Sequence, residues 1–302
     1  METYIMQIFN GLSVSSIYIL AALGLVITFG LMKIINMSHG EFIMIGAYVT
    51  YLIQNLFIGY LDKSFLGLYF IMAIPASFIV AGLIGFILEG TVIRHLYNRP
   101  LDSILATWGV SLVLQQLARN IFGAPNVDVQ SPSWLAGGLV LSQGLQLPYK
   151  RLFIIALVIA CLMGMFVLLY KSKTGLRIRA VMQNREMAES MGINTRRVDA
   201  LTFAIGSGLA GIAGCALTLL GSIGSTLGTN YIVDTFMVVV LGGVGTLMGT
   251  VAGGLLIGTA NTILEFLTNT SLAKVLVFIL IIAFLQWKPK GLFNISSRSL
   301  DE

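Results

Sequence analysis

A short polar stretch, residues 36–41, separates two strongly apolar segments and holds side chains suited to contacting a polar solute. It contains Asn36, His39 and Glu41, and Gly40 permits a tight turn. Glu41 is placed favourably at the start of the following helix, where the positive end of the helix dipole attracts an acid. The stretch is explained equally well as a turn with a helix cap and as the inner end of a solute pathway, and both interpretations stay open.

Neutral hydrogen-bonding residues inside the apolar segments form a second group of candidates. Each could instead make an interhelical hydrogen bond worth about 1 kcal/mol. The group comprises Thr28, Gln54, Asn55, Thr107, Ser111, Gln115, Gln116 and Asn261. Thr107 and Gln115 are preferred because they fall in the middle of their segment. We therefore expect Asn36, His39, Glu41, Thr107 and Gln115 to line a substrate pathway for a small polar solute.

The segment 174–199 is basic and of mixed polarity, unlike the rest of the chain. Such a stretch is ordinarily a solvated loop. Here Ala180, Met187, Ala188 and Met191 can form an apolar face on a short helix that ends at Gly192. A helix of this kind can dock in the groove of a partner protein.

Motifs for nucleotide binding, metal binding or nucleophilic catalysis are missing from the sequence. There is no G-x-x-x-x-G-K-[ST] phosphate loop, no H-E-x-x-H spacing around His39 or His95, and no G-x-S-x-G serine. Cys161 and Cys215 lie within apolar runs and read as small buried hydrophobic residues. The net charge of +5 is too small, and the basic residues are too dispersed, for nucleic-acid binding. We expect neither an enzyme nor a metal site, and no cofactor in this chain.

The composition requires a lipid environment for the elements that position these residues. Apolar residues make up 57% of the chain, charged residues only 10%, and the mean hydropathy is +0.91. A bilayer core needs about twenty apolar residues per helix. Eight segments meet this length: Leu12–Met32, Glu41–Tyr60, Phe65–Leu88, Ile104–Phe122, Leu152–Tyr170, Val198–Leu220, Gly245–Leu267 and Leu272–Trp287. We predict an all-α polytopic membrane protein that forms one transmembrane domain over residues 1–302.

A ninth apolar run, Ile232–Gly242, is too short for an upright crossing and predicts a half-helix, a re-entrant segment or a tilted crossing. The connection 171–197 carries seven basic residues, so the positive-inside rule assigns it to the cytoplasm. Alternation then makes the links 33–40 and 90–103 cytoplasmic and 123–151 external. Nine crossings, which we favour over eight, also place the basic tail with Lys288, Lys290 and Arg298 inside.

Small residues recur every four positions in two segments and predict helix-packing faces. Gly206, Ala210, Gly214 and Thr218 form one face, and Gly245, Gly249 and Gly253 form another, with Gly254 and Gly258 one step round. Lipid offers no hydrophobic drive for helices to associate, so close backbone approach has to hold them together. The segments ending at Met32 and Leu220 each precede a polar turn and a further apolar segment, which indicates an internal duplication.

The stretch 185–192 resembles the cytoplasmic loop through which permease subunits of ABC importers engage their ATPase. Glu186, Met187 and Ala188, followed after three residues by Gly192, are similar to the family pattern E-A-A-x-x-x-G and depart from it at the middle alanine. The resemblance implies that residues 171–197 are an ATPase-coupling loop. The coupling residues it implies are Arg185, Glu186, Ala188, Met191 and Gly192.

Further residues extend the resemblance over essentially the whole chain and indicate the branched-chain amino acid permease family. They are Ile35–Glu41, Gly175, Arg179–Val181, Gly192–Asn194, Arg197–Val198, Phe203, Gly208–Gly214 and Pro289–Phe293. Within the family, the urea permease branch is the most similar. The residues that resemble this branch are Ala106–Ser111, Ala124–Val129 and Ser131–Trp134.

The resemblance implies a multi-pass subunit of the bacterial inner membrane that binds no ATP itself. It implies three kinds of partner: ATPase subunits inside, a second related permease, and a solute-binding protein outside. Because the urea branch is the most similar, we expect the chain to form half of a translocation pathway for urea. The few charges that lie centrally in its helices fit a neutral solute. Half-helix ends can also solvate carboxylate and ammonium groups, so branched-chain amino acids remain the alternative. A passive channel for small neutral solutes is a further alternative, which would have no use for a docking segment.

Overall fold

The computed structural model describes residues 2–32, 34–60, 67–97, 99–142, 145–289 and 291–293. The expectations that concern Lys33, Lys290 and Arg298 lie outside these residues. The described part contains eleven α-helices, two short 3-10 helices and one β-hairpin. The elements are α1 (Glu2–Met32), α2 (His39–Tyr60), α3 (Tyr69–Thr91), η2 (Ile93–Leu96), α4 (Pro100–Phe122), η3 (Ser133–Leu135), β1 (Gly138–Ser142), β2 (Leu145–Pro148), α5 (Tyr149–Lys171), α6 (Lys173–Gln183), α7 (Arg185–Ser190), α8 (Thr195–Leu217), α9 (Leu227–Gly242), α10 (Leu247–Leu267) and α11 (Thr270–Trp287).

The helical membrane fold predicted from hydropathy is confirmed. Seven of the described helices are long and apolar enough to cross a membrane: α1, α2, α3, α5, α8, α10 and α11. Helix α4 is 23 residues long and more polar, and α9 has 16 residues. These nine helices match the eight predicted segments and the short ninth.

The predicted start of α9 and the predicted end of α8 were wrong. Helix α9 begins at Leu227 instead of Ile232, because its first turn contains Gly228, Thr229 and Asn230, which hydropathy alone does not count as membrane helix. The segment predicted to continue to Leu220 ends as a helix at Leu217 and continues as a turn.

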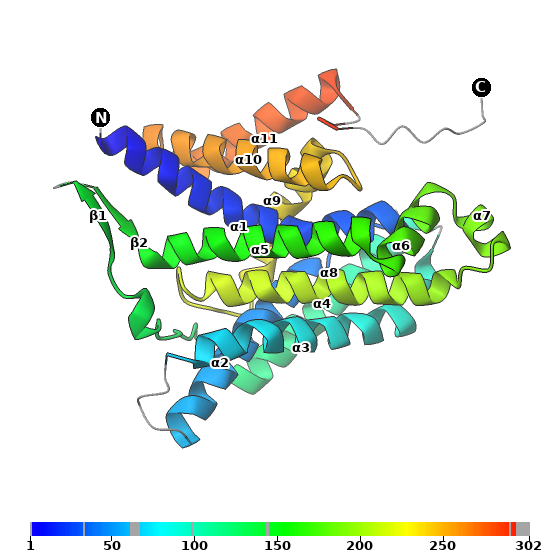
Figure 1. Cartoon of the computed structure of the whole chain (residues 1–302), viewed down its shortest axis with the longest axis horizontal. Helices are drawn as coiled ribbons and strands as arrows, with labels where there is room; N and C mark the ends of the chain where they lie inside the picture. The colour runs from blue at the N-terminus through cyan, green and yellow to red at the C-terminus, as the bar shows by residue number, and fades with distance from the viewer. Residues whose placement is uncertain are drawn as a thin grey trace.

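The bundle has two distinct ends (Figure 1). The β-hairpin lies at one end beside the start of α1, and α6 and α7 lie at the other, where α5 ends and α8 begins. We call these the hairpin end and the elbow end. At the hairpin end, the link 123–131 is hydrogen-bonded to the chain that follows α8. Val127 and Ile223 exchange backbone hydrogen bonds of 2.9 Å, and Arg119 Nε donates to Ser225 Oγ at 2.9 Å.

Helix α8 is the centre of the packing, and its predicted glycine face is confirmed. Gly206 packs against Gly24 of α1, and Gly214 packs against the backbone of Ile43 in α2. A Cβ at Gly206 or Gly214 would overlap the backbone of the neighbouring helix. Accordingly α1 and α8 are the most completely buried spans, whereas α5 and α11 expose most of their surface.

The second glycine face also lies between helices. Gly249 and Gly253 of α10 contact α9, while Gly254 and Gly258 contact α1 at Ile19 and Ser15. Gly245 was expected on the same helix but lies in the turn before it, with φ +79°, because α10 begins only at Leu247. Small residues on two sides of α10 thus let it pack closely against two neighbours at once.

The chain turns back into the bundle after α1. His39, the first residue of α2, has its Nε2 atom 3.1 Å from the carbonyl oxygen of Ala21, which lies well inside α1. Helix α2 therefore starts within the bundle instead of at its surface. Helix α9 starts at the same level, because the backbones of Gly40 and Gly228 are in contact.

The order of long helix, irregular return and second helix occurs twice, as α1 to α2 and as α8 to α9. In Figure 1 α1 runs from the hairpin end to the elbow end and α8 runs the opposite way. The two helix pairs thus run in opposite directions, and α1 and α8 cross at Gly24 and Gly206. Such inverted units are a recurring design of membrane transporters.

The far end of α9 is closed by the segment that follows α11. The backbone N–H groups of Leu292 and Phe293 donate to the carbonyl oxygens of Leu241 and Gly242, at 2.8 and 3.0 Å. A helix end inside a bilayer needs partners of this kind, because lipid offers none. The resemblance to the family had singled out this closing segment, and the structure gives it a structural role.

Candidate solute pathway and coupling segment

A cluster of polar side chains surrounds the point where α2 and α9 begin. Helix N-termini carry unsatisfied N–H groups and a partial positive charge, so two of them meeting inside a bundle form a polar centre. Glu41, in the first turn of α2, lies in this centre and is almost completely buried. The acid thus occupies the position that the helix dipole favours.

Helix α4 supplies the hydrogen bonds to Glu41. Ser111 Oγ donates to its Oε1 at 2.7 Å, and Gln115 Nε2 donates to the same oxygen at 2.8 Å. Gln115 Nε2 also lies 3.0 Å from Thr229 Oγ1 on α9. Among the described residues, the second carboxylate oxygen of Glu41 is buried without a hydrogen-bond partner. Glu41 therefore keeps an acceptor available at the centre of the bundle.

The link before α2 is stabilised by hydrogen bonds within the link and by one to α4. Asn36 Oδ1 accepts hydrogen bonds from the backbone N–H of Ser38 at 3.0 Å and from its hydroxyl at 2.6 Å. The backbone N–H of Met37 donates to Thr107 Oγ1 at 3.1 Å. The Nδ2 group of Asn36 is buried and has no partner among the described residues. Asn36 and Glu41 thus offer an unused donor and an unused acceptor.

Four of the five expected pathway residues come together here: Asn36, Glu41, Thr107 and Gln115. His39 belongs to the packing instead. Its ring contacts Ala21 of α1 through Nε2 and packs edge-on against Phe42 at 6.3 Å. Thr229 was not anticipated, since nothing in the sequence separates it from other polar residues near an apolar run.

The coupling segment is two short helices with a cap at each start. Ser172 Oγ accepts from the Gly175 N–H at the start of α6, and Asn184 Oδ1 accepts from the Met187 N–H at the start of α7. Asn194 does the same for α8, accepting from the Arg197 N–H at 3.1 Å. Side-chain caps of this type fix where each helix begins. The segment is therefore a defined elbow and not a loose loop.

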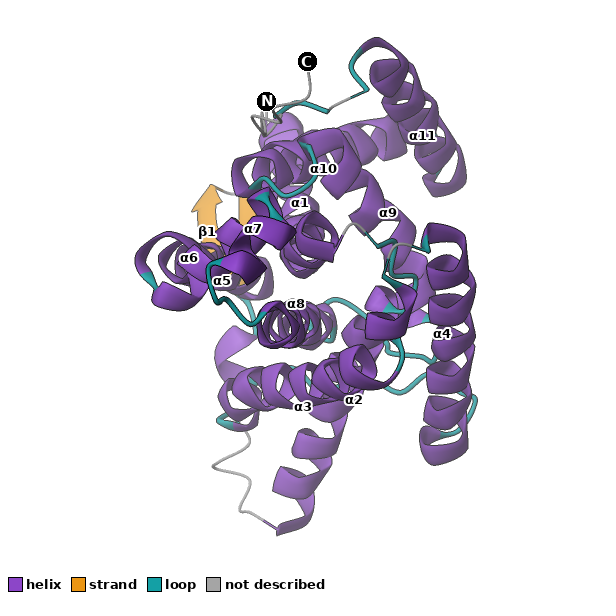
Figure 2. Ribbon diagram, turned by 90° about the vertical axis from the view of Figure 1, so that its right-hand side faces the viewer, coloured by secondary structure: helices purple, strands orange, loops and turns teal. Residues whose placement is uncertain are grey.

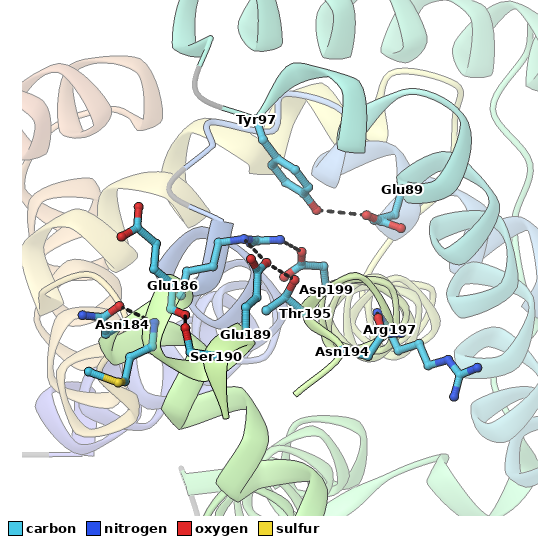
Figure 3. Close-up of polar contacts among 12 residues, drawn as sticks. Glu89, Tyr97, Asn184, Glu186, Glu189, Ser190, Asn194, Thr195, Arg197 and Asp199 are labelled. Atoms are coloured by element: carbon cyan, nitrogen blue, oxygen red, sulfur yellow. Dashed lines mark hydrogen bonds and ion pairs between the residues drawn. The ribbon is translucent and has the colours of Figure 1, made fainter. Parts of the chain in front are cut away.

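Arg185 anchors the elbow to the bundle (Figure 3). Its guanidinium donates to Asp199 Oδ2 of α8 at 2.5 Å, lies 3.7 Å from Glu189 Oε1, and stacks over the Tyr97 ring at 5.1 Å. Tyr97 in turn donates its hydroxyl proton to Glu89 Oε1 of α3 at 2.9 Å. Arg185 thus joins α7, α8 and the link after α3.

The charge states in this network follow from its surroundings. Burial, reinforced by the nearby carboxylates of Asp199 and Glu89, raises the pKa of Tyr97 above its usual value, so its hydroxyl stays protonated. Burial alone would lower the pKa of Arg185, but the hydrogen bond to Asp199 and the charges of Asp199, Tyr97 and Glu189 together outweigh this effect, and the net shift is upward. Arg185 therefore stays charged. No motif in the sequence indicated Tyr97 as a partner.

The expected apolar face of α7 is split between two directions. Ala188 is 4% exposed and packs inward, whereas Met187 and Met191 are 62% and 76% exposed. Glu186 is exposed as well, and Gly192 ends the helix with φ +80° and open space around it. The outward surface of the elbow thus includes Glu186, Met187, Met191 and Gly192, while Arg185 and Ala188 attach it to the bundle.

These features define the chain as a polytopic membrane permease, with a polar centre between two helix starts and an elbow presented at one end. Residues 7–285 match the family described as the permease component of branched-chain amino acid transport systems. The chain belongs to this family, whose members are permease subunits of ABC transporters and not enzymes. It is a multi-pass protein of the inner membrane.

Among its relatives is the high-affinity branched-chain amino acid transport system permease protein BraD of Pseudomonas aeruginosa, 30% identical over 96% of both chains. The permease protein LivH of the corresponding system in Salmonella typhimurium is 31% identical, again over 96% of both chains. The permease protein LivM of Escherichia coli is 25% identical over 95% of this chain and 70% of its own length. No solved structure matches the chain significantly.

Proposed function

We propose that the chain forms one half of the translocation pathway of an ATP-driven importer for branched-chain amino acids. The observation that carries this proposal is the end-to-end similarity to permeases of branched-chain amino acid systems, over 96% of both chains. The resemblance to the urea branch rested on a few short stretches, and urea permeases do not figure among these relatives. The alternative raised by the sequence therefore replaces urea as the leading substrate.

The partially unsatisfied polar centre supports an amino acid as cargo. An ammonium group can be accepted by the free oxygen of Glu41, and a carboxylate is favoured by the two helix N-termini. The neighbouring Gln115 and Thr229 can exchange hydrogen bonds with a passing solute. We infer that Asn36, Glu41, Thr107 and Gln115 line the pathway and that His39 supports it through packing.

The elbow is the proposed contact with the ATPase subunits, facing the cytoplasm. Met187 and Met191 provide flexible apolar surface of the kind that fits a partner's groove. Because Arg185 connects the elbow to α8, movement of the elbow is passed to α8 and through it to α2, which packs on α8 and carries Glu41. The other proposed partners are a second related permease and an external solute-binding protein.

Uptake by the assembled complex tests this function. The chain is reconstituted in proteoliposomes with its second permease, its ATPase subunits and its binding protein, and labelled leucine and urea are compared. Accumulation of leucine that requires ATP supports the proposal. Accumulation of urea alone would return the substrate to the urea branch, and flux of either solute without ATP would favour a passive channel.

A further inference from the structure

A second polar site lies on another face of α9, away from the Glu41 cluster. A cavity of about 460 Å³ lies between α1, α9, α10 and α11. This volume falls in the range of small-molecule sites, about 300–1,000 Å³. In Figure 2, which looks along the bundle from the elbow end, α9 lies between α4 and α11. Helix α9 therefore borders both the Glu41 cluster and this cavity.

The cavity contains an acid and a base of opposite charge. Asp234 of α9 lies 3.4 Å from the ammonium group of Lys274 in α11, and the Tyr18 hydroxyl donates to the same carboxylate oxygen at 3.3 Å. The Asp234 side chain is 9% exposed and that of Lys274 is 41% exposed. Ionisable residues within membrane helices are disfavoured, so the presence of this pair points to a function.

This pair is only loosely engaged. Charge-assisted hydrogen bonds are usually about 2.7–2.9 Å long, shorter than both contacts of Asp234. Lysine has three N–H donors, and within the described part of the chain Lys274 uses them on Asp234 alone. The pair therefore has unused capacity for a ligand that brings one charge of each sign.

The rest of the cavity wall suits an apolar group. Val14 and Ile17 of α1, together with Leu220 and Leu227, line the cavity alongside the charged pair. A neutral polar solute would gain nothing from these aliphatic walls. An α-amino acid with a branched aliphatic side chain combines both properties, because its head is a zwitterion and its side chain is apolar.

We propose that this cavity binds the amino acid cargo, with the ammonium group on Asp234, the carboxylate on Lys274 and the aliphatic side chain against Val14 and Ile17. This assignment rests on the proposed function. Binding requires the lysine to swing away from Asp234, which its partial exposure and flexible stem permit. The site adds a side-chain cation for the cargo carboxylate to the acceptor that Glu41 offers to the ammonium group.

Two double variants separate ligand binding from a structural ion pair. Asp234→Asn with Lys274→Gln removes both charges and leaves none unpaired, and Asp234→Lys with Lys274→Asp keeps an ion pair in reversed order. In the complete complex, we expect both variants to raise the half-saturation concentration for leucine at least tenfold while the partners still copurify. A reversed pair that transports like the wild type would mean that the charges only join α9 to α11, and would overturn the proposal.

The matched control neutralises an ion pair outside the cavity. Arg99 and Asp102 lie 3.8 Å apart and are both exposed, so Arg99→Gln with Asp102→Asn is expected to leave leucine uptake unchanged. Wild-type uptake in the same experiment reports on the proposed function separately. If the wild type accumulates leucine while the neutral pair has the same half-saturation concentration, the cavity assignment alone fails.

A labelling measurement covers the case in which the double variants do not assemble. Asn230→Cys places a thiol at the cavity with the charged pair intact, and Ser133→Cys provides an exposed reference site far along the chain. In the complete complex, leucine is expected to slow maleimide labelling at position 230 and not at position 133. Equal rates at position 230 with and without leucine would contradict binding in the cavity.

Discussion

Glu41 carries one of the polar atoms that lack a hydrogen-bond partner in the polar centre of the bundle. One carboxylate oxygen accepts from Ser111 and Gln115, and the other has no partner among the described residues. A buried acceptor without a hydrogen bond is unfavourable by about 1–3 kcal/mol, so a solute that donates to it gains that amount on binding. This makes Glu41 the residue at which substrate recognition can be tested most directly.

Glu41→Gln keeps the size of the side chain and an oxygen that accepts from Ser111, but removes the charge. We expect the half-saturation concentration for leucine uptake to rise about tenfold, corresponding to about 1.4 kcal/mol, with assembly retained. The measurement is the initial rate of uptake into proteoliposomes at fixed ATP. Gln116→Ala is the control, because Gln116 is exposed and, among the described residues, its amide donates to Asn120 on the same helix and not to Glu41. Equal kinetics for Glu41→Gln and the wild type would remove Glu41 from recognition.

At the scale of elements, the elbow attaches to the bundle through one set of side chains and presents another set outward. Ala188 faces the bundle and Met187 and Met191 face outward, although all three fall on the same helix in the sequence pattern. A charge at Ala188 would therefore test folding, whereas a charge at the methionines tests docking. The side chains that hold the elbow and those that contact the partner can be changed independently.

Met187→Asp combined with Met191→Asp is expected to abolish copurification of the ATPase subunits and ATP-driven uptake, because an apolar contact becomes charged. Copurification of the second permease should persist, since the fold is untouched. Ala188→Asp is expected instead to reduce the amount of folded chain in the membrane. If the ATPase subunits bind the methionine double variant as they bind the wild type, the elbow surface is not the docking site.

Helix packing makes a second test at this scale. Gly214→Leu places a side chain where the Ile43 backbone of α2 lies, so we expect a large loss of folded protein, since overpacking of a core typically costs about 1–3 kcal/mol or more. Gly164→Leu is the control, because a side chain at Gly164 of α5 meets open space. Fluorescence-detected size-exclusion of the detergent-solubilised chain measures both. Comparable yields for the two variants would contradict close packing at the glycine face of α8.

The whole molecule has a polarity that follows from its two ends. The elbow and the hairpin lie at opposite ends of the bundle in Figure 1, and the basic connection 171–197 belongs to the elbow end. The positive-inside rule then places the elbow in the cytoplasm and the hairpin outside. This orientation is required for ATPase subunits to reach Met187 and Met191.

Single cysteines at the two ends test the orientation. Ser133→Cys and Ser190→Cys are both exposed positions, introduced after Cys161 and Cys215 are replaced by Ala. In intact cells an impermeant maleimide is expected to label position 133, and to label position 190 only after the membrane is opened. The reverse pattern would place the elbow outside and exclude the proposed coupling to ATPase subunits.

The sequence by itself determined that this protein lies in lipid, that it is helical and where most spans end. Hydropathy over about twenty residues depends only on composition along the chain. It also located the glycine faces and the elbow, since spacing on a helix is a local property. The start of α9 at Leu227 escaped it, because Gly228, Thr229 and Asn230 are polar or small, and Gly228 meets α2 and Thr229 meets α4 only in the folded chain.

Only the tertiary structure decided which polar groups meet. Glu41 and Gln115 are 74 residues apart, and Asp234 and Lys274 are 40 apart. Their contacts arise because the chain re-enters the bundle twice and brings two helix starts to one level. For the same reason, His39 and Ala188 are packing residues and not the contacts expected from the sequence. The direction of a side chain depends on which helix lies beside it, and that neighbour comes from a distant part of the chain.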